Sequence, residues 1–369
     1  MRFYFRLSTL FLVLIYSALV SAQIVKVDLP KGLYAFNIAE DKQGNIWIGL
    51  SDGNTGGALA LVQNDTLVLK SGSNGIPSGS YHTSVSLPDG GLMFGGNLLS
   101  EGKPYLVWIT NYGIDTIQIP ISLSSPFINT ISLVNNRDIW LGTASGVLIN
   151  SYGKWSIYTV NNGLPHNFIN AIQQDFRGVV WIGTELGLAY YIDKTFSALE
   201  QTSRAIANVT QFYNDNKGYL WCGSRFSSDG ISVFNGKEWE TFSVRHGLED
   251  SSSSIFFQDS RGTLWVGSCY NRSRGGLSAF DGKNWTPYPS PEFLAKPCVD
   301  AIAEDKNGHI WIGGSLSSRK EKGITVFDGK KWKKIGNSTE LPADRVITFF
   351  SDSKGGMWVS SMEGLFVIR

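Results

Sequence analysis

The sequence predicts an all-β protein built as a single β-propeller, and three observations carry that prediction. A phrase of the form Asp-x-x-Gly-x-apolar-Trp-apolar-Gly recurs along the chain, as in 41–49 and 175–183. Its spacing of 40 to 47 residues is the period of a repeat protein in which each unit forms one small sheet. No stretch has the apolar period of an amphipathic helix, which argues against leucine-rich and helical repeats. The Trp position of the phrase falls at Trp47, Met93, Trp140, Trp181, Trp221, Trp265, Trp311 and Trp358.

Each unit is predicted to form four short antiparallel strands, which is a propeller blade. An apolar stretch such as 168–172 leads into the Asp-x-x-Gly segment, whose Asp and Gly are typical of a tight turn. The run around the Trp is rich in β-formers and makes a second strand. A third strand ends in Asn-Gly or Asp-Gly, as at 281–282, which favours a two-residue hairpin, and an aromatic such as Trp285 begins the fourth. We expect the Trp to fill the wedge between blades, and the Gly two residues later to let the next sheet approach.

The ends of the chain predict eight blades. The last unit, which carries Ser360 in place of the final Gly, stops at Arg369 without a fourth strand. Residues 24–28 form an extra strand that precedes the first unit. If this strand completes the last blade, the ring closes and leaves no unpaired edge. Seven blades are the alternative, because the units at Met93 and Trp140 are degenerate.

Residues 1–22 have the features of a secretory signal peptide, which leaves residues 23–369 as the propeller domain. Arg2 and Arg6 precede an apolar core, and Val20-Ser21-Ala22 fits the small-residue cleavage rule. An uncleaved anchor is the alternative, although the apolar run is shorter than the ~20 residues of a spanning helix. We therefore expect a periplasmic or secreted protein without a membrane span after cleavage. A net charge of +1 gives no global argument for a nucleic-acid partner.

The three cysteines are predicted to differ in state. Cys222 follows a repeat Trp, so a buried free thiol is expected. Cys269 ends the second strand of one unit and Cys298 begins the first strand of the next, which puts both at the same end of the propeller. An oxidising compartment permits a disulfide between them.

A ligand-binding face is predicted from the loops. Loops after the second strands are minimal in units three, four and eight but longer in units five to seven, and insertions in repeat proteins gather on one binding face. The loops before the first strands open on that face too. Tyr and Phe can stack on sugar rings, and Arg pairs with carboxylate or sulfate, so the expected ligand is an extracellular oligosaccharide, neutral or acidic, or a partner protein. Simple solvation of long polar loops is the alternative. The candidate residues are Tyr81, His82, Phe127, His166, Arg204, Arg225, His246, Tyr270, Arg272, Arg274, Arg319 and Arg345.

No catalytic or metal-binding motif stands out, so we expect no enzyme activity, no metal and no cofactor. Of the four His, His82, His166 and His246 precede first strands of different units, without a His-x-x-His or Glu-x-x-His spacing. His309 lies in a repeat turn and is expected to be solvated.

The segment 163–175, with Gly178, 181–184 and 187–188, resembles the two-component regulator propeller repeat. That family mostly forms the periplasmic sensor half of hybrid histidine kinases, and many members are implicated in recognising oligosaccharides. No kinase or receiver segment follows the last unit here. The resemblance therefore implies a sensor propeller that binds a saccharide or an envelope protein, with a separate sensor kinase as a candidate partner. The phrase also resembles the repeats of streptogramin lyases, but their His/Glu/metal centre finds no counterpart here residue by residue. A propeller lyase and a structural scaffold are the alternative functions.

Overall fold

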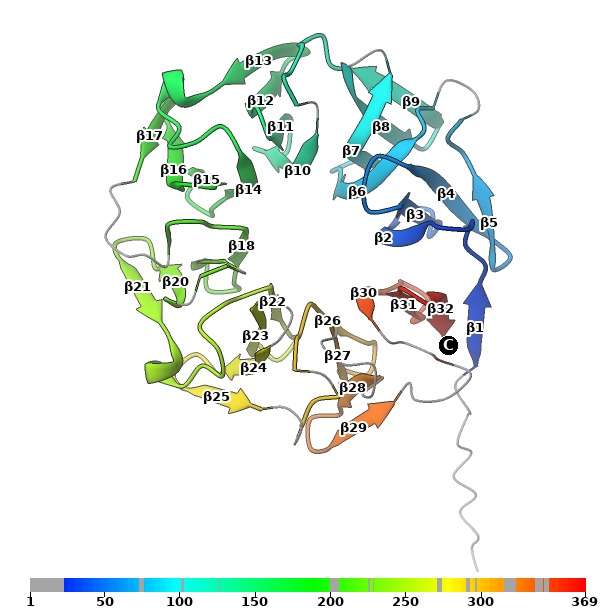
Figure 1. Ribbon diagram of the computed structural model, residues 1–369, viewed down its shortest axis with the longest axis vertical. Helices are drawn as coiled ribbons and strands as arrows, with labels where there is room; N and C mark the ends of the chain where they lie inside the picture. Colours follow the sequence, from blue (N-terminus) through cyan, green and yellow to red (C-terminus); the bar gives the residue numbers. More distant parts are fainter. Residues whose placement is uncertain are drawn as a thin grey trace, which may run out of the picture.

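Eight four-stranded antiparallel sheets stand in a ring around a central opening, in a computed structural model of the chain (Figure 1). This confirms the predicted propeller of eight blades, and the alternative of seven is wrong. The structure describes residues 23–72, 76–100, 103–125, 127–199, 206–224, 226–227, 229–270, 274–289, 293–295, 297–314, 323–335, 341 and 345–369. The predicted signal peptide lies outside these residues.

The first strand of each blade lines the central opening and the fourth lies at the rim (Figure 1). Blade 1 consists of β2 (Tyr34–Glu40), β3 (Ile46–Ser51), β4 (Gly57–Gln63) and β5 (Thr66–Leu69). Blade 2 consists of β6 (Gly79–Ser86), β7 (Leu92–Ser100), β8 (Lys103–Thr110) and β9 (Gly113–Gln118). Blade 3 consists of β10 (Ile128–Val134), β11 (Asp138–Thr143), β12 (Gly146–Ser151) and β13 (Lys154–Tyr158). Blade 4 consists of β14 (Ile169–Gln174), β15 (Val180–Thr184), β16 (Gly187–Ile192) and β17 (Thr195–Ala198).

The second half of the ring repeats this order, and two short 3₁₀ helices, Val160–Asn162 and Val244–His246, precede blades 4 and 6. Blade 5 consists of β18 (Gln211–Asn214), β19 (Leu220–Gly223), β20 (Ile231–Phe234) and β21 (Trp239–Phe242). Blade 6 consists of β22 (Ile255–Gln258), β23 (Leu264–Tyr270), β24 (Arg274–Phe280) and β25 (Trp285–Tyr288). Blade 7 consists of β26 (Ala301–Glu304), β27 (Ile310–Gly313), β28 (Ile324–Phe327) and β29 (Trp332–Ile335).

Blade 8 closes the ring with strands from both ends of the chain. It consists of β30 (Val346–Ser351), β31 (Met357–Ser361), β32 (Gly364–Ile368) and β1 (Ile24–Val27). Strand β1 pairs antiparallel with β32, with Ile24 opposite Ile368 and Val27 opposite Leu365 (Figure 1). The predicted closure by the N-terminal strand is therefore confirmed, and no blade keeps an open edge at this seam.

The Asp of the repeat joins the turn to the Trp. In blade 6, Asp259 Oδ1 accepts hydrogen bonds from the backbone N–H groups of Arg261 and Thr263, and Oδ2 accepts one from Trp265 Nε1. The same indole bond, 2.8–3.1 Å long, is present in blades 1, 4, 5, 7 and 8 as well. One carboxylate thus caps a tight turn and fixes the ring that fills the core.

Each Trp packs against the outer strands of the next blade, as the repeat predicts. Trp181 meets Trp239 edge-on at 5.3 Å, and Trp265 meets Trp332 in the same way at 6.3 Å. Between blades 1 and 2, Trp47 shares a core cluster with Val107 and Ile109 of the outer strand β8 and with the rings of Tyr81 and Phe94. Burial of these large rings supplies much of the hydrophobic stabilisation of each blade junction.

The Gly after the Trp is required by the approach of the next blade, which confirms the prediction. A Cβ on Gly49 would lie 2.2 Å from the carbonyl oxygen of Tyr81, and one on Gly183 would lie 2.7 Å from that of Val209. Ser360 replaces this Gly in blade 8. Its hydroxyl donates a 2.5 Å hydrogen bond to the carbonyl of Ala35 in blade 1, so a side chain is accommodated by bonding across the seam.

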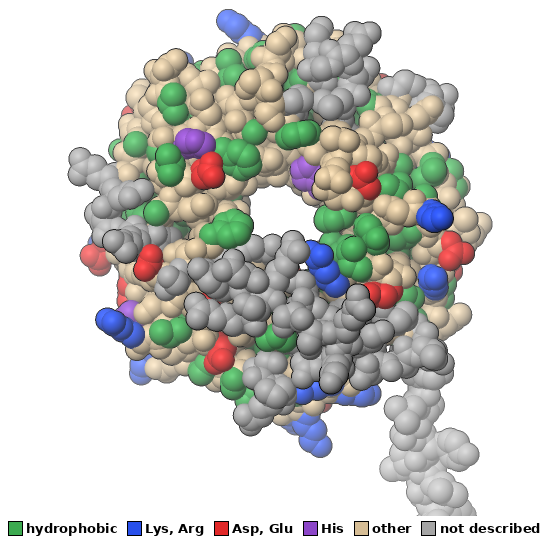
Figure 2. All heavy atoms as spheres, viewed as in Figure 1, with side chains coloured by type: hydrophobic (Ala, Val, Ile, Leu, Met, Phe, Trp, Pro, Cys, Tyr) green, Lys and Arg blue, Asp and Glu red, His purple; other side chains and the backbone are tan. Residues whose placement is uncertain are grey.

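The blades give the propeller two distinct ends. The turn face carries the turns between first and second strands and between third and fourth strands, such as 259–262 and 281–284 in blade 6. The loop face carries the links between second and third strands, such as 143–146, and the links from one blade to the next, such as 243–254. Figure 2 views the loop face, with the central opening in its middle.

Candidate binding face

The predicted binding residues that the structure describes lie at or near the loop face, but they do not form one cluster. Four of the twelve, Arg204, Arg225, Arg272 and Arg319, lie outside the described residues. Tyr270 and Arg274 face each other at the tip of the hairpin between β23 and β24, and only their backbone is described. The side chains of the remaining six can be placed.

Tyr81 was expected to offer an exposed ring, and this is wrong. Its side chain is fully buried and packs with Trp47 and Phe94, while its hydroxyl donates to the carbonyl oxygen of Pro77. Burial raises the pKa of this phenol. In β6, Thr83 is the residue that pairs with the repeat glycine, Gly95, and Tyr81 lies two residues before it. At this position the ring packs between blades 1 and 2 and does not face solvent.

His82 occupies a bulge in β6, where the register shifts between Tyr81 and Thr83. Burial lowers the pKa of the imidazole, and a hydrogen bond to the backbone of Ile128 in blade 3 acts in the opposite direction. The ring therefore helps to join two blades and is neutral at pH 7. Asn129 occupies the equivalent bulge in blade 3 and donates to the carbonyl of Ile169 in blade 4 at 2.9 Å.

The other two histidines have local partners. His166 Nδ1 lies 3.6 Å from a carboxylate oxygen of Glu185 and accepts a hydrogen bond from the backbone N–H of Phe168. His246 ends a 3₁₀ helix, and its Nδ1 accepts from the backbone N–H of Ser243, its N-cap. Both rings therefore order the links that precede blades 4 and 6. The turn residue His309, expected to be solvated, is half-exposed and bonds Asp305 at 3.0 Å.

Phe127 and Arg345 are half-buried and directly precede the first strands of blades 3 and 8. Three apolar residues that were not among the predicted binding residues are more exposed. Phe168 is 38% exposed, Leu186 60% and Phe226 63%, and all three lie on the loop face of blades 4 and 5. Figure 2 shows hydrophobic side chains bordering the central opening. A signal was available for Phe168, which occupies the same position before its first strand as Phe127.

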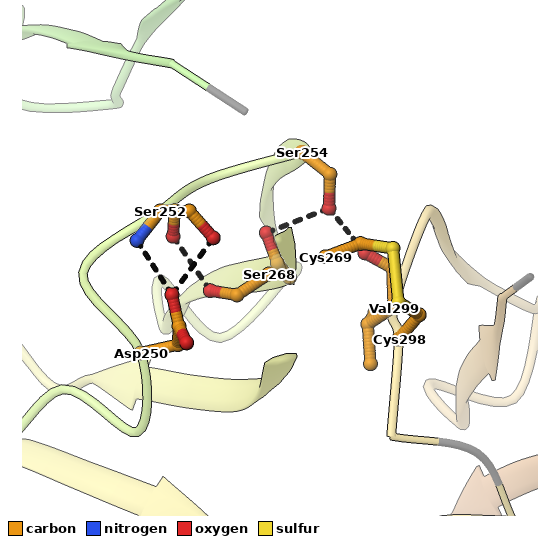
Figure 3. The surroundings of a disulfide bond; sticks show 8 residues. Asp250, Ser252, Ser254, Ser268, Cys269, Cys298 and Val299 are labelled. Atoms are coloured by element: carbon orange, nitrogen blue, oxygen red, sulfur yellow. Dashed lines mark hydrogen bonds between the residues drawn. A yellow bond between two sulfur atoms is a disulfide. The ribbon is translucent and has the colours of Figure 1, made fainter. Parts of the chain in front are cut away.

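The serine-rich link into blade 6 is held by its own hydrogen bonds (Figure 3). Ser252 donates to Asp250 through both its backbone N–H and its hydroxyl, each at 2.8 Å. Ser268 donates to the carbonyl of Ser252 at 2.7 Å. Beside this link, Cys269 and Cys298 form the predicted disulfide, with their Cα atoms 4.4 Å apart. These contacts fix the loop face where blades 6 and 7 meet.

Cys222 is a buried free thiol, as predicted, and burial raises its pKa.

Among the described residues, no group of three His, Cys, Asp or Glu side chains could hold a metal ion. No described helix is long and apolar enough to cross a membrane. The pair of His166 and Glu185 belongs to one blade, and no histidine of another blade is hydrogen-bonded to it within the described part of the chain. The described loop face carries exposed apolar side chains and hydrogen-bonded polar groups.

Comparison with known proteins bears on the repeats. Three stretches, 28–52, 163–185 and 294–315, match the family called two component regulator propeller. The chain carries two component regulator propeller repeats. The resemblance that 163–175 shows in sequence is thereby confirmed, and the matches fall on blades 1, 4 and 7. Comparison with curated proteins finds no match.

Solved structures share the propeller. A streptogramin B lyase aligns with a TM-score of 0.54 at 12% identity, over 94% of this chain and 97% of that chain. PorZ, described as an essential surface component of the type-IX secretion system of Porphyromonas gingivalis, gives 0.53 at 15%, over 90% and 52%. The extracellular domain of BT4673 from B. thetaiotaomicron gives 0.46 at 16%, over 92% and 53%. The chain spans about half the length of the last two. At these identities the likenesses to the lyase and to PorZ show the fold alone.

Proposed function

We propose that this protein is a non-catalytic recognition propeller of the cell envelope that binds an extracellular oligosaccharide at its loop face. The exposed apolar side chains of Phe168, Leu186 and Phe226, which blades 4 and 5 present on the loop face, carry this proposal. The flat rings of Phe168 and Phe226 are suitable partners for the C–H faces of sugar rings, and Leu186 adds apolar surface. Loops held on a rigid scaffold are a common place for binding sites.

An acidic oligosaccharide is the ligand class that the proposal favours. Arg345 is described at the loop face, and the loops of the neighbouring blades are rich in arginine in the sequence. Guanidinium groups bind carboxylate and sulfate through paired hydrogen bonds. The two component regulator propeller repeats support a sensor role, in which a separate sensor kinase would read the bound state.

A thermal-shift screen of residues 23–369 tests the proposal. Neutral, carboxylated and sulfated oligosaccharides are compared, and a ligand that binds only the folded state must raise the melting temperature. At 100 times Kd the stabilisation is about 2.7 kcal/mol, which corresponds to a shift of a few degrees. We expect the shift with an acidic oligosaccharide, and we expect Phe168→Ala and Phe226→Ala to reduce it.

Phe176 provides the matched control because it is 64% exposed but lies on the turn face. Phe176→Ala should keep the full ligand-induced shift, measured against each variant's own unliganded melting temperature. A panel without any shift, or an equal loss in Phe176→Ala, would contradict the proposal and turn attention to a protein partner.

A further inference from the structure

The junction between blades 3 and 4 lacks the Asp–indole hydrogen bond that six other blades make. Trp140 is 2% exposed, and its indole Nε1 has no hydrogen-bond partner, although residues 127–199 are all described. Val134 stands six residues before Trp140, where six other blades have the Asp that accepts this bond. A buried N–H without an acceptor is unfavourable and rare in folded proteins. The donor therefore lacks an acceptor that the chain itself supplies elsewhere.

A cavity is lined by Trp140, whose indole nitrogen is itself buried, so a ligand in the cavity must displace a covering side chain to reach it. The cavity has a volume of about 720 Å³ and lies at the turn face between blades 3 and 4. The equivalent wedge beside Trp221 holds a cavity of only about 160 Å³. The outer strand of the next blade explains the difference, because Phe196 in blade 4 takes the position that Trp285 takes in blade 6. Because the phenyl ring of Phe196 is smaller than the indole of Trp285, it leaves an empty volume in the range of small-molecule binding sites.

The walls of the cavity are aromatic. Tyr191 lies edge-on to Trp140, with ring centroids 4.9 Å apart, and Tyr158 lines the same space. Burial raises the pKa of Tyr191, and Tyr158 and Asp138 contribute to the same shift. The Tyr191 phenol therefore remains a neutral hydrogen-bonding group next to an apolar surface.

The one carboxylate near these phenols is already compensated. Asp138 accepts two hydrogen bonds from the Arg137 guanidinium, at 2.8 and 3.0 Å, and a third from the Ser151 hydroxyl at 3.0 Å. The Arg137 hydrogen bond is the main cause of the lowered pKa of Asp138. The remaining charges favour an anion. Arg177 of the lining is likewise paired with Asp175 at 2.5 Å, which leaves Lys154 and Lys194 against the one carboxylate of Asp193.

We propose that this cavity binds a small organic carboxylate with a flat apolar body, whose oxygen accepts the Trp140 indole N–H in place of the missing Asp. The ligand would recreate the carboxylate–indole bond of 2.8–3.1 Å that six other blades make internally. Its apolar body lies between aromatic walls, and the basic rim attracts its charge. The site is on the opposite end of the propeller from the loop face, so it is independent of the function proposed above.

The junction between blades 7 and 8 supplies a matched control. A cavity of about 760 Å³ lies beside Trp311 there, but the Trp311 indole already donates to Asp305 at 3.1 Å. This cavity matches the one beside Trp140 in volume and also has a Trp in its lining. It differs because the Trp311 indole N–H already has an acceptor. A carboxylate should therefore leave the Trp311 indole unaffected.

Titration of ¹⁵N-labelled residues 23–369 with phenylacetate tests the proposal, because the 12 Trp give separate indole N–H resonances. Trp140→Phe and Trp311→Phe assign the two resonances by their disappearance. We expect the Trp140 resonance to move in a saturable way and the Trp311 resonance to stay. Phenylacetamide, which lacks the charge, should bind at least tenfold more weakly.

Val134→Asp supplies the acceptor from the chain itself. It should move the Trp140 resonance without ligand and weaken phenylacetate binding at least tenfold. The other indole resonances report whether each variant keeps its fold. The proposal is overturned if millimolar phenylacetate leaves the wild-type Trp140 resonance in place, or if Val134→Asp titrates as the wild type does.

Discussion

The junction between blades 6 and 7 has every stabilising contact of the repeat, whereas the junction between blades 3 and 4 lacks several. At the first, Asp259 bonds the Trp265 indole at 3.0 Å, Trp332 fills the wedge, and a disulfide links the two blades. At the second, the Trp140 indole has no partner and Phe196 leaves a cavity of about 720 Å³.

The difference shows that the junctions of the ring are separable. Because each repeat contacts mainly its neighbours, stability is close to a sum of blade and junction terms. A junction can therefore lose contacts and gain a cavity while the other seven hold the ring. Blade 2 shows the alternative route, since Leu87 and Met93 replace the Asp and the Trp together, so neither partner of this hydrogen bond is present at the repeat position.

Removal of the disulfide should have the largest effect, and it would make the 6–7 junction more like the others. Cys269 and Cys298 are 29 residues apart in sequence, and a loop of that length is expected to contribute about 3–4 kcal/mol. Urea unfolding of Cys269→Ala/Cys298→Ala should show this loss. Reductant should destabilise the wild type and the Cys222→Ala control alike, and should leave the double variant unchanged. Equal midpoints with and without the bond would contradict the prediction.

Replacement of the Asp in blade 6 should reproduce the orphan donor of blade 3. Asp259→Leu removes the acceptor of the Trp265 indole and of two backbone N–H groups, so we expect a loss of about 2–3 kcal/mol.

A double-mutant cycle with Trp265→Met sharpens this prediction because it installs the pair found in blade 2. Asp259→Leu/Trp265→Met should cost less than the sum of the two single variants, by about 1–3 kcal/mol. Denaturant midpoints and slopes measure all four proteins. Strict additivity would mean that the carboxylate and the indole act independently, contrary to the bond that joins them.

The regular junctions could be predicted from the sequence, because each depends on a local phrase. The wedge position of the Trp and the close approach at the Gly follow from period and residue type alone. The burial of Tyr81 could not be read in this way, since it depends on Trp47 of the preceding blade. The capping role of His246 depends on a 3₁₀ helix too short to leave a periodic signal.

The cavity between blades 3 and 4 shows the same limit more clearly. The sequence shows that Val134 replaces an Asp, yet the empty space arises only because Phe196 arrives from another blade. Val134 and Phe196 are 62 residues apart in the sequence, and each is an ordinary residue for a β-strand. Their effect on the Trp140 junction arises only because the fold brings both into one core cluster.

The smallest effect, with the opposite sign, is expected when the missing Asp is restored. Val134 is 3% exposed, and the repeat tolerates a carboxylate at this depth, because Asp175 and Asp259 are each 5% exposed. A bond to the Trp140 indole should offset the burial of the charge, so Val134→Asp should stabilise the ligand-free protein by about 1 kcal/mol. A carboxyl that gains a partner has a lowered pKa in the folded state. The gain should therefore be present at pH 7 and disappear as the pH falls below about 4. Thermal unfolding of Val134→Asp and Val134→Leu at both pH values measures this. A variant that is less stable than wild type at pH 7 would mean that the turn at Asn135 and Asn136, both at positive φ, cannot place the carboxylate as the Gly-containing turns do.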